Sequence, residues 1–531
     1  MPDQSIAGVL RAQARRHPDR PFLTCGTDRL TFGELDERTD RVAAGLSALG
    51  VRPGDRVALL IPNRVEMAEL FFALAKLGAI QVPLNAFLKG EFLRYQLADC
   101  TATVLVADSA GIAAALPLLE GLSGLTGIVC LDEPDAEVPD LLVTRYADLR
   151  QTTSPLPEVE VTATQLMSIV YTSGTTGFPK GCMLPHGYYL RCGQVMVDTV
   201  ELTDDDVLLT AMPLFHGACR MLVLAAGLLR GIEVCIEPEF RASTFLHRAA
   251  EVGATFALGV GAMGTALLAQ PPGAVDRAHR LRAFMLIPFP PDRQDQFRER
   301  FGVDAWAEAY GQTECVPVTC NRLSGDRSAP SCGRPAPDLD VALLDDDDTE
   351  VATGQIAEIC VRPRTPFSMY VGYWGKPEAT LTAFSTLWYH TGDYGRRDHD
   401  GFISFVDRKK DAVRRRGENV STVELENAIV THPEIAEVAV HAVPSEATED
   451  DIKACLVLAP GAHLDPDTLF PFLRERLPYF AVPRYVELLD ELPKNAVGRV
   501  MKFQLRERPN TGDRVWDFER LGLTVRRDER R

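Results

Sequence analysis

The chain has 531 residues, of which 46% are hydrophobic and 24% charged, and 74 acidic against 56 basic side chains give a net charge of −18. This length exceeds one ordinary hydrophobic core, so at least two domains are expected. The acidic balance disfavours a general nucleic-acid or anionic-membrane surface, because proteins that bind phosphate polymers need a basic footprint.

The start of the chain shows no targeting segment. Residues 1–30 carry charge throughout and lack the apolar core of roughly 7–15 residues found in signal peptides. The most apolar stretch, 221–229, is far too short to span a bilayer. Twelve scattered cysteines, without a CxxC pair or a closely set Cys/His cluster, favour reduced, mostly buried thiols over disulfides or a zinc site. The sequence therefore predicts a cytoplasmic protein.

Strands and helices alternate in the first part of the chain. RVALLIPN (56–63) has the pattern of a buried strand, 64–78 has helical spacing and a terminal glycine, and 79–85 returns as a strand. This βαβ pattern recurs to about residue 400 and predicts sheets covered by helices. LMSIVYTSG (166–174) is an apolar strand that runs directly into a loop, and ligand loops in such folds lie at the carboxyl ends of strands.

The pattern changes near Asp407. Ser421 and Glu424 form a capping box for a helix to about Val430. Further elements are expected in the order strand, strand, helix, strand, at 436–444, 451–461, 465–478 and 484–490. We therefore expect an α/β protein with a large multi-sheet N-terminal domain, residues 1–406, and a small α+β C-terminal domain, residues 407–531. The charged residues from Arg506 onward are assigned no element.

The loop YTSGTTGFPKG (171–181) has the composition of a phosphate-binding segment. It is not a P-loop, because Pro179 stands where the second glycine is needed and Gly181 replaces the hydroxyl after Lys180. Small residues let backbone N–H groups approach phosphate oxygens, hydroxyls add donors, and Lys180 adds a point charge. Taken alone, such a loop is more often a polar turn.

Four ordered motifs resemble the adenylate-forming superfamily of acyl-CoA synthetases, luciferases and peptide-synthetase adenylation domains. YTSGTTGFPKG matches the family's phosphate loop, YGQTE (310–314) its second signature, YHTGD (389–393) its third, and DRKKDAVRRRGENVSTVELEN (407–427) its hinge region. The runs GENVSTVELEN and FMLIPFPP (284–291) look closest to the crotonobetaine/carnitine–CoA ligase branch. The resemblance, which runs from about residue 7 to residue 505, implies an acid–CoA ligase that uses ATP, Mg²⁺ and coenzyme A. It also implies a mobile C-terminal domain that rotates about Asp407 between the two half-reactions.

The resemblance also implies the roles of individual residues. The groups that hold the β- and γ-phosphates are Thr172, Ser173, Gly174, Thr175, Thr176 and Lys180. Glu314 would bind Mg²⁺, since a hard cation prefers carboxylate oxygens, and Thr313 would contact the α-phosphate, with Tyr310 and Gly311 beside the nucleotide.

Further positions would serve the ribose, CoA and the acid. Asp393 would accept both ribose hydroxyls through its two oxygens, and Arg408 would approach the ribose. Gly417 and Glu418 would reach the active site after the rotation. His216, in PLFHG (213–217), would border the carboxylate pocket, although a structural role for a single histidine stays open. Other candidate pocket residues are Val260, Gly261, Phe289, Gly311 and Val316. His390 is interpreted as a packing residue.

One position departs from the family pattern. The small domain normally ends in a loop whose last lysine bridges the carboxylate and the α-phosphate, and LPKNAVGRVMK (492–502) has Arg499 there. Either Arg499 substitutes, or Lys502 reaches in, or adenylation is crippled and the protein performs mainly the thioester step on a supplied acyl-AMP. Loading of a carrier protein, a non-catalytic acyl-adenylate binder, a separate adenylating partner and a homodimer also stay open. The sequence does not name the acid.

Overall fold

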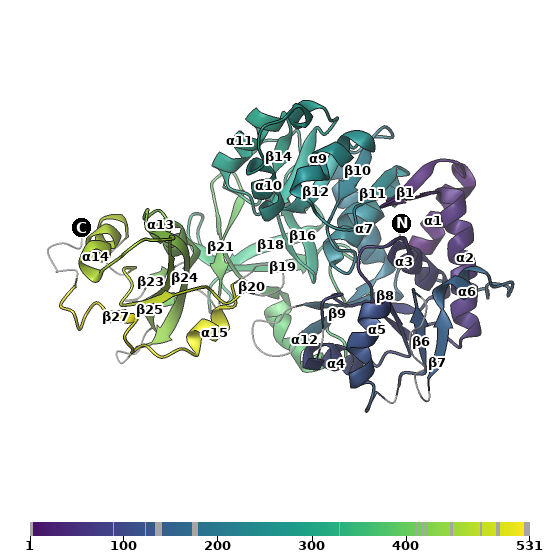
Figure 1. Ribbon diagram of the computed structural model, residues 1–531, viewed down its shortest axis with the longest axis horizontal. Coiled ribbons are helices and arrows are strands. Elements are labelled where there is room, and N and C mark those ends of the chain that lie inside the picture. The colour runs from purple at the N-terminus through teal and green to yellow at the C-terminus, as the bar shows by residue number, and fades with distance from the viewer. Residues whose placement is uncertain are drawn as a thin grey trace. The chain divides into compact units, whose positions relative to one another are not determined.

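The computed structural model describes residues 4–88, 90–122, 124–132, 141–172, 179–328, 330–409, 413–415, 418–420, 422–445, 450–477, 481–494 and 500–524. The chain divides into two compact units (Figure 1). The first consists of Met1–Val341, Val361–Tyr389 and Asp400–Ile403, and the second of Ala342–Cys360, His390–His399 and Ser404–Arg531. Because the second unit includes stretches from before residue 407, the boundary at Asp407 stays a prediction.

Two seven-stranded sheets form the framework of the first unit. The first sheet has the order β14 (Asp304–Trp306), β13 (Ala283–Ile287), β12 (Phe256–Val260), β10 (Val207–Thr210), β11 (Glu233–Ile236), β1 (Pro21–Cys25) and β2 (Asp28–Thr31). The second has the order β7 (Leu142–Arg145), β6 (Gly127–Cys130), β5 (Val104–Ala107), β3 (Arg56–Leu60), β4 (Ile80–Pro83), β8 (Leu166–Thr172) and β9 (Lys180–Pro185). All neighbouring strands are parallel except β1–β2 and β8–β9.

The first unit also contains α-helices, numbered in chain order. They are α1 (Ile6–Arg16), α2 (Phe32–Ala48), α3 (Val65–Leu77), α4 (Gly90–Asp99), α5 (Ser109–Ala115), α6 (Tyr146–Arg150), α7 (His186–Thr199), α8 (Ala225–Arg230), α9 (Ala242–Glu251), α10 (Gly261–Leu268), α11 (Pro291–Phe301) and α12 (Pro377–Ala383). Short 3₁₀ segments lie at η1 (Leu116–Leu118), η3 (Ala274–Arg277) and η4 (Ser385–Leu387), and a π-helix at η2 (Cys219–Leu224). Almost every residue of α3 is buried, because this helix is apolar on nearly all sides.

A small antiparallel sheet carries the YGQTE motif. Its order is β15 (Ala309–Gln312), β16 (Cys315–Cys320) and β17 (Arg334–Pro335). Thr313 and Glu314 form the turn between β15 and β16. The motif is therefore presented at the tip of a hairpin.

A four-stranded sheet has the order β18 (Leu339–Leu344), β19 (Ile356–Pro363), β20 (Tyr389–Arg397) and β21 (Ile403–Arg408). The second unit contains the hairpin β22 (Val413–Arg415) and β23 (Glu418–Val420), and a sheet β24 (Ile435–Pro444), β25 (Asp450–Leu458), β26 (Tyr485–Leu489) and β27 (Val515–Asp517). Its helices are α13 (Thr422–Ile429), α14 (Pro466–Arg476) and α15 (Lys502–Arg506).

The sheet of β24 to β27 has apolar residues on both faces. Adjacent residues Ala439 and Val440 belong to different hydrophobic clusters, since successive side chains of a strand point to opposite faces. The cluster of Val440 includes residues of α13 and α14, and that of Ala439 includes Leu505 of α15. This unit therefore has a core of its own.

The local predictions agree with these elements. The strand, helix and strand expected at 56–85 are β3, α3 and β4, and Gly78 ends α3 in the left-handed conformation at φ 64°. Asp465 caps α14 by accepting a hydrogen bond from the Thr468 N–H at 2.8 Å. The capping box of Ser421 lies outside the described residues. The strand β27 was not expected from the charged C-terminal residues; it pairs with β26 through its backbone.

All twelve cysteines are free, and ten of them are buried, as predicted. The part of the chain that the structure describes contains no helix long and apolar enough to cross a membrane. The predicted fold class, an α/β protein with a large multi-sheet first part and a smaller α+β part, is confirmed.

Candidate functional site

The ends of the candidate phosphate loop are held by a pair of strands. Thr172 ends β8 and Lys180 begins β9, and the two residues face each other in the antiparallel register. The Thr172 hydroxyl donates to the Lys180 carbonyl at 3.4 Å. Ser173, Gly174, Thr175 and Thr176 lie outside the described residues. The loop is thus anchored at the carboxyl end of β8, where a ligand loop was expected.

Lys180 and Glu314 both contact Tyr373, Lys180 at the aromatic ring and Glu314 at the hydroxyl. The Lys180 ammonium lies 4.8 Å from the centre of the Tyr373 ring, and the Tyr373 hydroxyl donates to Glu314 Oε1 at 2.8 Å. Glu314 is buried, with 7% of its surface exposed. Its carbonyl accepts from the Tyr370 N–H at 2.8 Å. Burial, and after it the charge of Glu314, raise the pKa of Tyr373, which keeps its hydroxyl a proton donor.

Tyr188 of α7 holds the turn of YGQTE through its hydroxyl. Its buried hydroxyl donates to the Thr313 carbonyl at 3.1 Å and accepts from the Val316 N–H at 2.8 Å. Gly311 is required here because a Cβ would lie 2.9 Å from the Cys315 carbonyl. Tyr310 is half-buried, and its hydroxyl accepts from the Gln312 side chain at 3.4 Å. The motif is thus held by hydrogen bonds within its own hairpin and from Tyr188 of α7.

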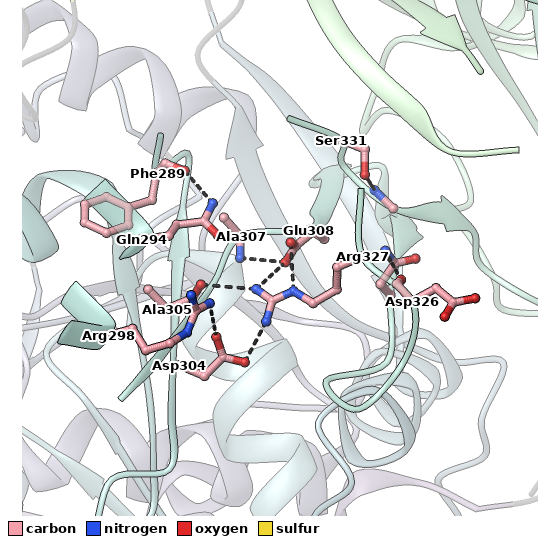
Figure 2. Close-up of polar contacts among 12 residues, drawn as sticks. Phe289, Gln294, Arg298, Asp304, Ala305, Ala307, Glu308, Asp326, Arg327 and Ser331 are labelled. Atoms are coloured by element: carbon pink, nitrogen blue, oxygen red, sulfur yellow. Dashed lines mark hydrogen bonds and ion pairs between the residues drawn. The ribbon is translucent and has the colours of Figure 1, made fainter. Parts of the chain in front are cut away.

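The start of β15 is fastened by Arg327 (Figure 2). The guanidinium contacts Glu308 through Nε at 2.9 Å and Nη2 at 3.0 Å, and Asp304 through Nη1 at 2.6 Å. Nη2 also donates to the Ala305 carbonyl at 3.2 Å. Arg327 therefore ties the residue before β15 to the edge strand β14.

His216 lies in a loop held by a buried asparagine. Asn63 accepts from the Leu214 N–H at 2.6 Å and donates to the Met212 and Glu237 carbonyls at 3.0 and 2.9 Å. His216 is exposed, yet burial by surrounding protein atoms, followed by the charge of Arg220, lowers its pKa. With its pKa below the ordinary histidine value, the ring is neutral at neutral pH.

Of the other candidate pocket residues, Gly311 lies on β15 and Val316 on β16, whereas Val260, Gly261 and Phe289 lie at the ends of β12 and β13. Val260 ends β12 and Gly261 begins α10, so close to the next segment that a Cβ would lie 1.8 Å from the Pro288 carbonyl. Phe289 is buried, its ring packs against Phe297, and its carbonyl accepts from Gln294 at 2.9 Å (Figure 2). The Phe289 ring is therefore part of the hydrophobic core.

In the second unit, Asp393 and Arg408 form an ion pair. Arg408 Nε lies 3.3 Å from Asp393 Oδ1. Asp393 is buried and its N–H donates to the Thr391 hydroxyl at 3.1 Å. Two of the residues predicted to contact the ribose are thus brought together.

Asp407 and Lys502 both contact Thr422. The Asp407 carboxylate accepts from the Thr422 N–H at 2.6 Å and its hydroxyl at 2.7 Å. Lys502 donates to the same hydroxyl at 2.7 Å and forms an ion pair with Glu426 at 2.8 Å. Arg499 and Gly417 lie outside the described residues, and of Glu418 the backbone in β23 is described. Lys502 is therefore held within the C-terminal sheet and helices.

Sequence reasoning missed Tyr373 and Arg327. Neither belongs to a motif, and each acts through a contact with a residue distant in the chain. No spacing within the sequence signals such a contact.

Comparison with known proteins adds the family. A model of AMP-binding enzymes matches residues 10–374, and a model of the C-terminal domain of AMP-binding enzymes matches residues 424–499. The chain belongs to the family of AMP-binding enzymes. It is 34% identical to crotonobetaine/carnitine–CoA ligase of Escherichia coli O157:H7, strain EC4115, over 90% of this chain and 93% of that protein. The corresponding ligase of Salmonella agona is 33% identical with the same coverage.

Solved structures of this family are also similar. The anthranilate–CoA ligase AuaEII in complex with anthranoyl-AMP has a TM-score of 0.84 and 26% identity, covering 95% of this chain and 97% of that one. ATP-bound MatB of Rhodopseudomonas palustris has a TM-score of 0.84 and 28% identity, covering 95% and 99%. The predicted superfamily, the branch resemblance and the enzyme class, an AMP-forming acid–CoA ligase, are confirmed.

Proposed function

We propose that this ligase converts a carboxylic acid and ATP into acyl-AMP and pyrophosphate, and then transfers the acyl group to CoA with release of AMP. In the first step a carboxylate oxygen bonds to the α-phosphorus and pyrophosphate leaves. In the second step the CoA thiol loses its proton to solvent and its sulfur bonds to the acyl carbon. The bond from that carbon to the phosphate oxygen breaks, and AMP leaves. The observation that carries the proposal is the meeting of Lys180 and Glu314, from two separate motifs, on Tyr373.

For adenylation, we assign the leaving pyrophosphate to the phosphate loop and Lys180. A cation near the β- and γ-phosphates stabilises the charge that develops as pyrophosphate leaves. Glu314 fits Mg²⁺, because its buried carboxylate keeps acceptor positions beyond the one that binds Tyr373. Bound Mg²⁺ would neutralise phosphate charge and orient the triphosphate. Support for ATP and magnesium comes from a related MenE of Bacillus subtilis in complex with both, with a TM-score of 0.81 and 26% identity.

For the nucleoside, we assign the ribose hydroxyls to Asp393, with Thr313, Tyr310 and Gly311 beside the phosphate and base. Because Arg408 pairs with Asp393 in this structure, it is available to orient that carboxylate toward the ribose. Gly417 and Glu418 are assigned to the CoA step. The neutral ring of His216 is assigned to the acid pocket.

The role of the family's bridging lysine, which contacts the carboxylate and the α-phosphate, is assigned to Arg499 rather than to Lys502. Use of Lys502 would break its ion pair with Glu426 and leave that carboxylate without its cation. We infer full ligase activity, with adenylation as the weaker step.

A purified-protein screen tests the activity: betaines, aromatic acids, succinylbenzoate and short mono- and dicarboxylic acids are incubated with ATP, Mg²⁺ and CoA. Mass spectrometry detects acyl-CoA, and pyrophosphate release is measured in parallel.

The screen also separates the alternatives. Acyl transfer to a phosphopantetheinyl protein in preference to CoA would indicate carrier loading. Conversion of supplied acyl-AMP without acyl-AMP synthesis would indicate a thioester enzyme with a separate adenylating partner. Tight acyl-AMP binding with no turnover on any acid would indicate a binder and overturn the proposal.

Arg499→Lys tests the weaker step. We expect faster acyl-AMP formation, with thioester formation from supplied acyl-AMP within about threefold of the native rate. Single-turnover rates of both steps are the measurement, and Lys502→Met is the control that should lower stability but leave adenylation unchanged. Slower adenylation in Arg499→Lys would show that arginine is the competent residue.

The cytoplasmic location and the homodimer stay predictions.

A further inference from the structure

Three side chains with metal-binding atoms meet on the sheet of β18 to β21. Glu358 and Cys360 lie two residues apart on β19 and so point to the same face, and His390 lies on the neighbouring strand β20. His390 Nδ1 is 3.2 Å from Glu358 Oε2 and 3.4 Å from Cys360 Sγ. The three ligand atoms all lie within 4.8 Å of one another. Glu358 and Cys360 are buried, and the His390 side chain is 18% exposed.

The two distances from His390 Nδ1 are near those of a tetrahedral site. Zinc bonds of about 2.0–2.2 Å to N and O and about 2.3 Å to S place ligand pairs about 3.4 Å (N to O) and about 3.6 Å (N to S) apart. The two observed distances from Nδ1 are each about 0.2 Å shorter than these values. An ion could therefore enter between the three atoms after a small outward movement.

Behind the ligands, the described residues make one supporting hydrogen bond, to Glu358, and a carboxylate lies near the free nitrogen of His390 without a hydrogen bond to it. The second ring nitrogen of His390 faces Asp348 Oδ1 at 3.5 Å, and Nε2 has no hydrogen-bond partner among the described residues. The second oxygen of Glu358 accepts from the Gly392 N–H at 2.9 Å. Metal-bound histidines commonly donate their other N–H to a carboxylate, and metal-bound carboxylates are themselves hydrogen-bonded.

We propose that Glu358, Cys360 and His390 bind a zinc-type divalent cation, with Asp348 orienting the imidazole and the fourth position open to water. The ligand set selects the metal, since thiolate and imidazole suit zinc whereas Mg²⁺ requires oxygen ligands. This site is separate from the magnesium site assigned to Glu314. It does not depend on the proposed reaction.

Binding requires a change of protonation. A cysteine thiol is ordinarily protonated at neutral pH, whereas a cysteine bound to zinc is a thiolate. On binding, the S–H bond breaks, sulfur donates its electron pair to the ion, and one proton passes to solvent. The imidazole binds through the lone pair on Nδ1 and keeps its proton on Nε2, toward Asp348.

Lys409 competes with the ion for one oxygen. Its ammonium lies 3.0 Å from Glu358 Oε2 and 3.0 Å from Asp346. The ion would displace the ammonium from Glu358, and Asp346 remains as its partner. Removal of the ammonium should therefore tighten metal binding, which a purely structural ion-pair network does not predict.

Metal binding to the full chain tests the site. The tag-free protein is treated with chelator and titrated with Zn²⁺ in excess Mg²⁺, and bound zinc and released protons are counted. Co²⁺ is the spectroscopic probe, because a thiolate ligand gives a charge-transfer band. We expect about one ion and about one proton per chain, and a cobalt band. Cys360→Ser should abolish the band, Asp348→Asn should weaken binding about 10–100-fold, and Lys409→Gln should strengthen it.

Cys332→Ser is the matched control, a half-buried cysteine outside the cluster, and should keep native affinity and the band. The native protein decides the proposal even where a variant does not fold. Absence of the cobalt band from native protein, or its persistence in folded Cys360→Ser, would overturn it. Equal loss in Cys332→Ser would also overturn it.

Discussion

Tyr373 serves two charged residues with different parts of its side chain. Its ring face lies under the Lys180 ammonium, and its hydroxyl binds Glu314. A cation over an aromatic face is stabilised by the ring quadrupole, and a hydrogen bond to a carboxylate fixes the direction of its oxygens. The residue is therefore expected to orient Glu314, the proposed magnesium ligand, without contacting the reacting atoms.

Tyr373→Phe separates these contacts, because it keeps the ring and removes the hydroxyl. A hydrogen bond to a charged group contributes about 1.5–3 kcal/mol, so we expect the Mg²⁺ concentration for half-maximal acyl-AMP formation to rise at least about tenfold. Thioester formation from supplied acyl-AMP should change less than about threefold. Tyr95→Phe is the control, since that hydroxyl binds Asp99 at 3.2 Å. An unchanged Mg²⁺ requirement would contradict this role.

At the scale of elements, the YGQTE hairpin depends on contacts outside itself. Tyr188 of α7 holds its turn, and Arg327 holds the residue before β15 against β14 (Figure 2). Glu308 is nearly fully buried, with 4% of its side chain exposed, and Arg327 is 21% exposed. A buried carboxylate is costly without its cation, so Arg327 is expected to matter more than an exposed arginine.

A double-mutant cycle measures this contact. Arg327→Ala should lower the free energy of unfolding by about 3 kcal/mol, because Glu308 is left buried without its cation. Glu308→Gln combined with Arg327→Ala should cost clearly less than the sum of the single changes. Arg298→Ala is the matched control: it also contacts Asp304, but its side chain is 49% exposed, so a cost below about 1 kcal/mol is expected. Additive single effects in urea unfolding would contradict the coupling.

At the scale of the whole molecule, each unit has its own hydrophobic core and its own buried titratable groups. In the second unit His441 is fully buried, and burial lowers its pKa to about 4. Its Nδ1–H donates to the Ala442 carbonyl at 3.0 Å. The folded protein therefore holds this ring neutral, whereas the unfolded chain takes up a proton near pH 6.5.

This difference predicts an acid-dependent loss of stability. The contribution of His441 is fully present above about pH 6.5 and is lost as the pH falls toward about 4, because protons then bind preferentially to the unfolded chain. Between pH 7 and 4.5 the loss should be on the order of 2 kcal/mol. His441→Gln should remove this part of the pH dependence in urea unfolding, and His399→Gln, at an exposed position, should not. Parallel pH profiles of native protein and His441→Gln would refute the assignment.

The sequence by itself determined what depends on neighbouring residues. Apolar periodicity placed β3, α3, β4 and β8, Gly78 and Asp465 marked helix ends, and ordered motifs identified the family. These features are readable because side-chain period, capping and loop chemistry act over a few residues. The strand β27 was not predicted, because it is held by backbone pairing with β26 and not by an apolar pattern of its own.

The tertiary structure decided which distant side chains meet. Tyr373 reaches Lys180 and Glu314, and Arg327 reaches Glu308, across separate elements. Cys360 and His390 lie far apart in the sequence, and no spacing there predicts a metal site. Pairing of β19 with β20 places Cys360 Sγ 3.4 Å from His390 Nδ1. Strand order and register fix such contacts, and these follow from the packing of the whole sheet rather than from any short stretch of chain.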